Sequence, residues 1–338
     1  MKKLVKAVAW IVGVVVVIVA VAGSALYVTT QRRLDKKWVV AGHRLAIPTD
    51  SLALLRGRYL ATTISKCGDC HKPDFGGGLF IDGMPMARLY TANLTRGRGG
   101  IGGQLSDLDW ERAIRHGVKP DGSALLMMPS LEFQNLTDED MAALIAFLKT
   151  LPPVNRQPGK NRIGPIGRVL FAKGDLPLMH AELINHTAAH PAPVPMGVSV
   201  EYGRYIVDIG GCKGCHGPGL SGGHIPGTPP EWKPAANITP AGIGHYQEED
   251  FFRALREGKR PGGVPLDSLM PYRFTRNMSD DEIRAVYLYL KTVPPKARSS
   301  SQNPVAVKRC PMAAQPPATS AASNVSAVAS MWNSGNGQ

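Results

Sequence analysis

Cysteine is scarce in this sequence, with five residues in a chain of 338. Four of them lie in two short motifs, and the fifth, Cys310, stands alone near the end. So few cysteines make a poor disulfide framework for a chain of this length, and the odd one has no free partner within the chain. We therefore expect Cys310 to be an unpaired thiol in a disordered tail rather than a lipidated or bridging residue.

The body of the chain also lacks an excess of positive charge, although the formal net charge is +13. Residues 1–37 carry seven basic residues and one acidic residue, and residues 296–338 carry four basic residues and no acid. These ends account for +6 and +4, which leaves only +3 for the segment between them. A protein that binds nucleic acid needs a basic face on its folded domain, so we do not expect this chain to bind nucleic acid.

No stretch shows the alternation of apolar and polar residues that is typical of half-buried strands. Helical spacing or capping signals instead mark residues 55–65, 106–117 and 136–153. The last of these has Thr137 as a cap, acidic residues in its first turn and prolines at its end, and a similar segment begins at Ser279. Glycine (37) and proline (28) are abundant, which favours small helical domains with long loops. The predicted fold class is all-α.

A charge-free run covers residues 7–28 near the N-terminus. A helix of this length spans the roughly 30 Å of a membrane's hydrocarbon core. A secretory signal peptide is the alternative, but its apolar region is usually shorter, at roughly 7–15 residues, and Gly23–Ala25 is a weak cleavage site. We predict an uncleaved single-pass anchor, whose orientation the basic residues on both flanks leave open.

The chain contains an internal repeat, whose two copies keep the same order of motifs. The matching segments are Gly57–His71 with Gly203–His216, Thr91–Thr95 with Ala235–Thr239, Asp109–Gly117 with Asp250–Gly258, Leu126–Ser130 with Ser268–Tyr272, and Leu136–Pro153 with Met278–Pro295. A duplicated domain of about 100 residues explains this pattern. The predicted organisation is an anchor with its flanks (1–37), a first domain (38–154), a linker (155–200), a second domain (201–295) and a disordered tail (296–338). Within the linker, residues 168–183 are apolar enough to pack against the membrane or a partner.

Each copy of the repeat contains a Cys-x-x-Cys-His pentad: Cys67, Cys70 and His71 in the first, and Cys212, Cys215 and His216 in the second. Zinc would need a fourth ligand that neither pentad offers, and a redox dithiol needs no trailing histidine. The third reading is covalent attachment of haem, in which two thiols bind the vinyl groups and the histidine binds the iron. Two haem c groups would also fill the centres of domains that are too loop-rich to bury a core of their own. Because haem of this type is attached outside the cytoplasm, we expect the bulk of the chain in the periplasm and the anchor in a bacterial inner membrane.

The repeat also indicates which residue would be the sixth ligand of each haem iron. Met128 and Met270 coincide in the repeat, and each precedes a proline, which restricts the methionine to an extended conformation. A thioether opposite an imidazole raises the reduction potential and leaves no site for a substrate. Histidine is the alternative ligand, but none of the candidates recurs at equivalent positions: His116, His180, His224 and His245. The predicted axial pairs are His71 with Met128 and His216 with Met270.

Other equivalent residues are expected to be scaffold. They are Tyr59 and Tyr205, Asn93 and Asn237, Arg58 and Arg204, and Trp110 and Phe251. We expect the tyrosines on the helix that packs against the last helix of their own domain, at Phe147 and Leu148 or at Tyr289 and Leu290. The asparagines are expected to form turns, with a hydrogen bond to a haem propionate as the alternative. The arginines are alternative partners of a haem propionate, and the last pair is expected to line the haem pocket.

Segments such as "CGDCH", "ERAIRHGV" and "LTDEDMAALIAFLKTLPPV" resemble class I cytochrome c domains, and the resemblance covers Leu55 to Pro295. Tandem domains of this kind occur in membrane-attached dihaem cytochromes and in cytochrome subunits of quinoprotein alcohol and sugar-acid dehydrogenases. The resemblance implies an electron carrier with no catalytic residue. It would take electrons from a dehydrogenase or a quinol-oxidising complex and pass them to an acceptor such as a terminal oxidase.

Two other functions remain as alternatives. The chain could be a cytochrome subunit of a quinoprotein dehydrogenase, although the subunits in question carry three haems and are held at the membrane mainly by their C-terminal region. It could also be a dihaem peroxidase, which needs one iron with an open position. The Met-Pro pair in both halves argues against the peroxidase.

Overall fold

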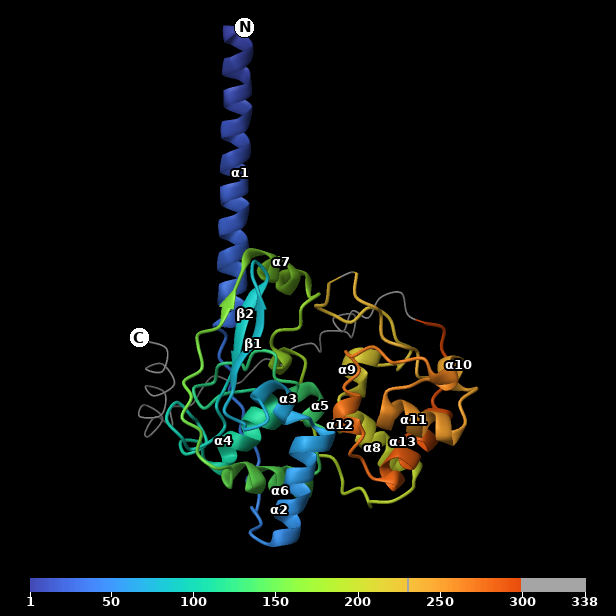
Figure 1. Ribbon diagram of the computed structural model, residues 1–338. Coiled ribbons are helices and arrows are strands. Elements are labelled where there is room, and N and C mark those ends of the chain that lie inside the picture. Colours follow the sequence, from blue (N-terminus) through green and yellow to red (C-terminus); the bar gives the residue numbers. More distant parts are fainter. Residues whose placement is uncertain (230, 299–338) are drawn as a thin grey trace.

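The computed structural model describes residues 1–229 and 231–298 of the chain, so Cys310 and most of the predicted tail lie outside the described residues (Figure 1). The α-helices are α1 (Lys2–Leu34), α2 (Ser51–Tyr59), α3 (Cys67–His71), α4 (Asp107–Glu111), α5 (Ser130–Phe133), α6 (Asp138–Lys149), α7 (Pro165–Lys173), α8 (Val200–Ile209), α9 (Cys212–His216), α10 (Pro240–Ile243), α11 (Glu248–Glu257), α12 (Tyr272–Thr275) and α13 (Asp280–Thr292). Short π-helical turns continue α2 and α4, namely η1 (Leu60–Ile64) and η2 (Arg112–His116). Two 3-10 turns, η3 (His180–Glu182) and η4 (Pro261–Gly263), complete the helical elements of the described residues.

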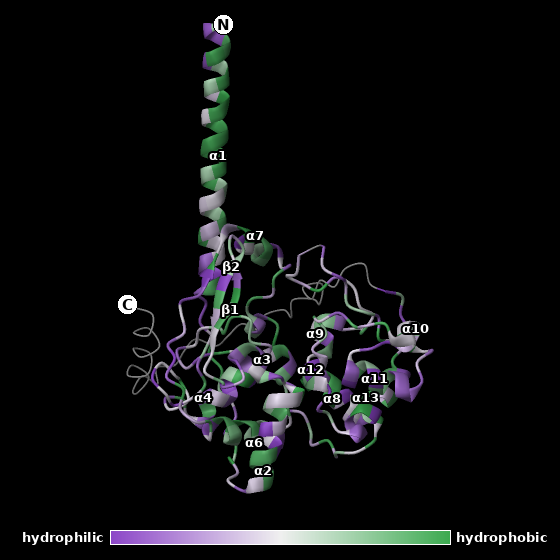
Figure 2. Cartoon of the chain, viewed as in Figure 1, coloured by the Kyte–Doolittle hydropathy of each residue, from purple (hydrophilic) through white to green (hydrophobic). Residues whose placement is uncertain are grey.

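Helix α1 projects away from the body of the molecule and exposes its apolar side chains along most of its length (Figures 1 and 2). Its 33 residues would extend about 50 Å at 1.5 Å per residue. The helix is therefore long and apolar enough to cross a membrane. Only Thr30, near its C-terminal end, is buried against the body.

The same helix pair forms the centre of each half of the repeat: α2 packs against α6, and α8 packs against α13. Equivalent glycines allow the close approach, since a Cβ on Gly57 would lie 1.9 Å from the carbonyl oxygen of Ala143. A Cβ on Gly203 would lie at the same distance from the carbonyl oxygen of Ala285. The predicted caps are confirmed: the side chain of Thr137 accepts a hydrogen bond at the start of α6, and the side chain of Ser279 does so at the start of α13.

A small antiparallel sheet corrects the prediction of an all-α fold. Its strands are β1 (Gly78–Gly83), β2 (Ala87–Thr91) and β3 (Arg162–Ile163), in the order β1-β2-β3. Strands β1 and β2 have only six and five residues, which is too few to show a clear alternation of apolar and polar side chains. A register shift between Leu79 and Ile81 also interrupts the alternation in β1. Only β2 keeps the pattern, because Ala87 and Leu89 are buried while Arg88 is exposed.

The segment predicted as a linker contains β3, α7 and η3, and it builds a second hydrophobic cluster against the sheet and the first half of the repeat. Phe171, Leu178 and Met179 from this segment are almost fully buried there. The segment also holds the end of α1, because the Arg33 guanidinium pairs with Glu182 and donates to the carbonyl oxygen of Phe171. The apolar residues 168–183 thus pack against this chain itself, which the sequence did not indicate.

Candidate functional site

The two pentads form the single-turn helices α3 and α9. Each helix follows a residue with a left-handed backbone: Lys66 has φ 51° and Gly211 has φ 68°. Within one helical turn, residues three apart lie on the same face, so Cys67 and Cys70 form a pair, as do their counterparts in α9. This spacing is the one that attachment of haem through two thioethers requires.

The four thiols of the pentads are free and lie partly covered by the surrounding chain. Burial raises the pKa of Cys67 to about 12 and the pKa of Cys70 to about 11. Burial likewise raises the pKa values of Cys212 and Cys215. The thiols are therefore uncharged at neutral pH, whereas a redox-active dithiol relies on a thiolate.

The histidine of each pentad is held in one orientation by a backbone carbonyl. The Nδ1–H group of His71 donates to the carbonyl oxygen of Ala92 at 2.8 Å, and that of His216 donates to Ala236 at the same distance. Burial lowers the pKa of both imidazoles, which favours the neutral ring. A neutral ring fixed through Nδ1 leaves the lone pair of Nε2 as the donor, as in metal-binding histidines generally.

The predicted methionine ligands lie in two loops of matching conformation. After Met128, Pro129 has φ −79° and ψ 51°, and after Met270, Pro271 has φ −80° and ψ 50°. In both loops the residue after the proline donates its N–H to the methionine carbonyl oxygen at 2.8 Å, which makes an inverse γ-turn. Both methionines are half-buried and pack against the same hydrophobic core as Cys67 and Cys212.

The residues around these groups suit a bound haem. Trp110 is only 2% exposed, and its buried indole Nε1–H has no hydrogen-bond partner among the described residues. A buried donor without a partner is costly, and an anionic group of a cofactor would satisfy it. Together with neutral imidazoles, free thiols and thioethers, this donor fits the haem implied by the pentads. The equivalent residue in the second half, Phe251, has no such donor.

Several other sequence-predicted residues have structural roles. Asn93 is fully buried, and its side chain bonds the backbone of Val154, Arg156 and Thr95, which supports the predicted turn. The candidate propionate partners Arg58 and Arg204 are both exposed.

Two of the alternative histidine ligands also have other partners in the structure. The Nδ1 atoms of His116 and His186 lie 3.0 Å apart. His180 accepts a hydrogen bond from the backbone N–H of Leu131 at 3.3 Å.

The helices that carry Tyr59 and Tyr205 pack against the last helix of their own half, as predicted, but the two hydroxyls reach the other half. The hydroxyl of Tyr59 bonds the carboxylate of Glu282 and accepts from the backbone N–H of Ser279, both at the start of α13. The hydroxyl of Tyr205 donates to Asp140 at 2.6 Å and accepts from the backbone N–H of Thr137, at the start of α6. The equivalent tyrosines therefore cross between the halves in a reciprocal way. Burial raises the pKa of each tyrosine above its usual range.

The pentads themselves lie at this interface between the halves. The Nζ of Lys66, next to the first pentad, donates to the carbonyl oxygen of Gly210, just before the second, at 2.5 Å. The helix that follows each methionine contacts the pentad of the other half: Arg273 on α12 pairs with Asp69 of α3. Glu132 on α5 lies against α9, since its carboxylate oxygen would be 3.0 Å from a Cβ on Gly214. The two attachment sites are thus brought together across the interface, a feature that sequence reasoning missed.

A family model for cytochrome c matches residues 55–152 and 200–294, which together make up more than half of the chain. The chain belongs to the cytochrome c family. The resemblance noted in the sequence is thereby confirmed, and domains of this family imply covalently bound haem c. Both matched regions contain a complete pentad and a Met-Pro pair at the equivalent position, Met128-Pro129 in the first and Met270-Pro271 in the second.

Relatives of this cytochrome c include a dihaem cytochrome c and cytochrome subunits of dehydrogenases. A "Diheme cytochrome c-type" protein of Cereibacter sphaeroides is 33% identical over 225 residues, which cover 58% of this chain and 68% of the relative. The gluconate 2-dehydrogenase cytochrome c subunit of Pantoea cypripedii is 30% identical, covering 73% of this chain and 60% of the subunit. The fructose dehydrogenase cytochrome subunit of Gluconobacter japonicus is 29% identical, covering 73% and 54%. The chain thus spans little more than half the length of the dehydrogenase subunits.

Proposed function

We propose that this protein is a membrane-anchored dihaem cytochrome c that carries single electrons in the periplasm. The observation that carries the proposal is the twofold occurrence of one complete arrangement. Each half of the repeat has two thiols on one helical turn, an imidazole fixed through Nδ1, and a methionine in a proline turn. Helix α1 supports a single-pass anchor in the bacterial inner membrane. The chain makes or breaks no bond in a substrate.

In the first half, Cys67 and Cys70 would hold the haem, and His71 Nε2 and the Met128 sulfur would bind its iron. Cys212, Cys215, His216 and Met270 would do the same in the second half. When bound, the haem supplies a one-electron couple between ferrous and ferric iron. The hydrogen bond at Nδ1 increases the donor strength of each imidazole, and the thioether raises the reduction potential. With a histidine and a methionine bound to each iron, no position would be left for peroxide or oxygen.

The contacts between the halves support electron exchange between the two sites. Lys66 and Gly210 join the backbone before one pentad to the backbone before the other, and Arg273 pairs with the first pentad from the second half. Packing of the pentads against a common interface shortens the path between the groups they hold. If each pentad holds a haem, these contacts would favour exchange of an electron between the two.

The proposal is tested on the full chain purified in detergent. A reduced pyridine haemochrome spectrum should give two haem c groups per polypeptide, and the far-red Met–Fe(III) band should account for both. Met128→Leu and Met270→Leu should each remove about half of that band. Five-coordinate iron in the unaltered chain, or turnover of hydrogen peroxide, would instead support the dihaem peroxidase.

A second candidate is a cytochrome subunit of a dehydrogenase complex, which the names of two relatives favour. In that case the electron donor would be a tightly bound catalytic subunit rather than a transient partner such as a quinol-oxidising complex. Affinity purification from detergent-solubilised membranes distinguishes the two. A stoichiometric dehydrogenase that reduces both haems would establish the subunit, whereas isolation of the chain alone would favour the free carrier, whose acceptor would be a terminal oxidase or a similar complex.

A further inference from the structure

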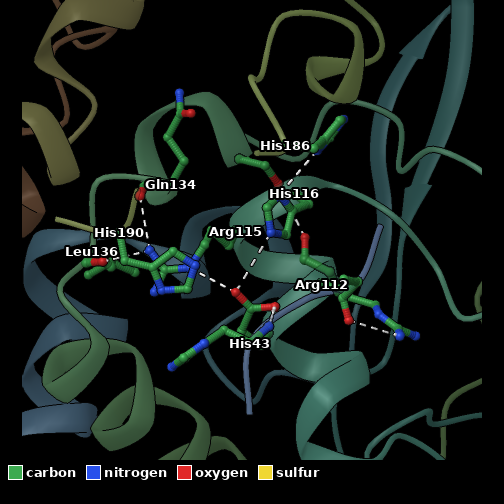
Figure 3. A network of polar contacts seen from close by, with 12 residues as sticks. His43, Arg112, Arg115, His116, Gln134, Leu136, His186 and His190 are labelled. Atoms are coloured by element: carbon green, nitrogen blue, oxygen red, sulfur yellow. Dashed lines mark hydrogen bonds and ion pairs between the residues drawn. The ribbon is translucent and has the colours of Figure 1, made fainter. Parts of the chain in front are cut away.

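Four of the chain's nine histidines gather on one face of the first half, at the side where the linker packs (Figure 3). This histidine face consists of His43, His116, His186 and His190. His43 precedes the first matched region, and His186 and His190 lie between the two matched regions. These segments are therefore additions to the cytochrome c domains rather than parts of them. The role in haem binding proposed above uses none of these side chains.

Three side chains of this face form a compact set of metal-type donors: His43, His190 and Asp138, the first residue of α6. One ligand atom from each lies within 4.8 Å of the others. The Nδ1 of His190 is 2.8 Å from Oδ1 of Asp138, and the Nε2 of His43 is 3.5 Å from its Oδ2. Ligands at 2.0–2.1 Å around tetrahedral zinc are separated by about 3.3 Å, so small side-chain rotations suffice to bind an ion.

The carboxylate of Asp138 is held in place from the interior. The guanidinium of Arg115, whose side chain is 3% exposed, donates to Oδ1 at 2.9 Å. Its charge is offset by the fully buried Glu111, which accepts from the Arg115 Nε–H at 2.8 Å. Glu111 also accepts the backbone N–H of His43 at 3.2 Å. This network orients the carboxylate and the segment carrying His43, as outer-shell partners do in metal sites.

The cluster is accessible to an ion from solvent. The side chains of His43 and Asp138 are 52% and 36% exposed, while that of His190 is 26% exposed. The rings of the two histidines meet edge to face, with centroids 4.6 Å apart. Two imidazoles and one carboxylate match the nitrogen and oxygen donors that zinc accepts, and the open side leaves room for water as a fourth ligand.

We propose that His43, Asp138 and His190 form a binding site for a divalent transition-metal ion, with Zn²⁺ as the expected occupant. The ion would join three segments distant in sequence: the stretch after the anchor, the linker and the start of α6. It would thereby fix the linker on the first cytochrome c domain. The site is independent of the haem ligands, so it stands or falls separately from the proposed electron-transfer function.

The experiment uses the full haem-containing chain in detergent, treated with chelator and then titrated with Zn²⁺ by calorimetry. We expect one equivalent to bind and the midpoint of thermal unfolding to rise with zinc. His190→Gln and His43→Asn should each weaken binding by more than about tenfold, since loss of even an outer-shell partner costs roughly 10–100-fold. The exposed His245 provides a matched control, and His245→Gln should bind zinc as the unaltered chain does.

Zinc X-ray absorption of the loaded protein gives an independent readout, which should show two imidazoles among nitrogen and oxygen ligands. Circular dichroism and the haem spectrum of each variant should be unchanged, which separates loss of a ligand from loss of the fold. The proposal is overturned if zinc does not bind at equimolar concentration. It is equally overturned if both variants bind as tightly as the control, or if the control loses binding to the same extent.

Discussion

The two halves of the repeat share their haem-binding parts and differ in what surrounds them. Both have a left-handed residue before the pentad, a carbonyl that fixes the histidine, and a proline turn after the methionine. Among the described residues, only the first half has a sheet and the histidine face, and the second hydrophobic cluster, to which the linker contributes, is built against this half. The two halves thus share the parts that would bind a haem, and they differ in the segments that pack around those parts.

A second difference lies at equivalent positions next to the cofactor. The left-handed residue is Gly211 in the second half but Lys66 in the first, where the side chain reaches the carbonyl oxygen of Gly210. A non-glycine residue is disfavoured in this conformation, and here its side chain bridges the halves. Likewise, Trp110 offers a buried donor where Phe251 offers none. We therefore expect the two proposed haem sites to differ in environment, although the same residue types would bind the iron in each.

The largest expected effect separates the two attachment sites. Cys67→Ala with Cys70→Ala should remove one haem per chain, and Cys212→Ala with Cys215→Ala should remove the other. Each double variant should thus contain one haem instead of two, because each pentad binds its own. Pyridine haemochrome spectra against protein concentration measure this ratio. Loss of both haems from either double variant would mean that the halves cannot mature separately.

The close helix crossings should be equally sensitive in both halves. Gly57→Ala and Gly203→Ala each place a Cβ 1.9 Å from a carbonyl oxygen, so the helices must separate. We expect each change to lower the free energy of unfolding by about 3 kcal/mol or more. Urea denaturation followed by circular dichroism measures the loss. Gly103→Ala is the control, because its Cβ meets nothing closer than 3.7 Å and should change little.

Much of this fold could be predicted because local signals in the sequence agree with one another. The caps at Thr137 and Ser279 and the glycine that ends η2, Gly117, are found where the sequence predicts them. Caps depend on a few adjacent residues, so tertiary packing rarely overrides them. The family and the division into two like halves could be predicted because the pentads and the repeated motifs are also local signals.

The contacts between the halves and the small sheet could not be predicted in this way. Tyr59 fits the apolar pattern of its helix, and nothing local shows that its hydroxyl reaches Glu282 in the other half. The available signal was the repeat itself, because two copies of a domain can pack with two-fold symmetry. Equivalent residues then make equivalent contacts, as Tyr205 does with Asp140. The strands of the sheet are short and interrupted by a bulge, which erases their period.

The histidine face should make the first half more sensitive to acid than the second. Burial lowers the pKa of His116 to about 3, and nearby positive charge adds to the effect. The groups facing it are His186 and His190 from the linker, with Glu111, Arg112 and Arg115 from its own helical segment. Because the unfolded chain binds a proton that the folded chain refuses, this stability is present above about pH 6.5 and lost as the pH falls toward 3.

Between pH 7.5 and pH 5 we expect a loss of about 2 kcal/mol in the free energy of unfolding from this histidine. Urea denaturation in the presence of chelator measures it, and His116→Gln should flatten the pH dependence. The exposed His245 should have no such effect when changed to glutamine. An unchanged slope in His116→Gln would show that another group controls the acid sensitivity.

The smallest expected effect concerns the reciprocal tyrosines. Tyr59→Phe and Tyr205→Phe each remove one hydrogen bond to a buried carboxylate, which we expect to cost about 1–2 kcal/mol of unfolding free energy. The two losses should be similar, because both carboxylates keep other hydrogen bonds. Glu282 keeps those from Tyr202 and the Ser279 N–H, and Asp140 keeps two from the Arg56 guanidinium.

The double tyrosine variant should depart from the sum of the two, because Arg56 pairs with Asp140 and also lies 3.8 Å from Glu282, so the two carboxylates share a partner. Tyr289→Phe is the control, because the Tyr289 hydroxyl has no hydrogen-bond partner in the described residues. If both tyrosine changes cost no more than this control, the hydroxyls do not hold the halves together. The interface would then depend on its apolar packing and on the contacts of Lys66 and Arg273 alone.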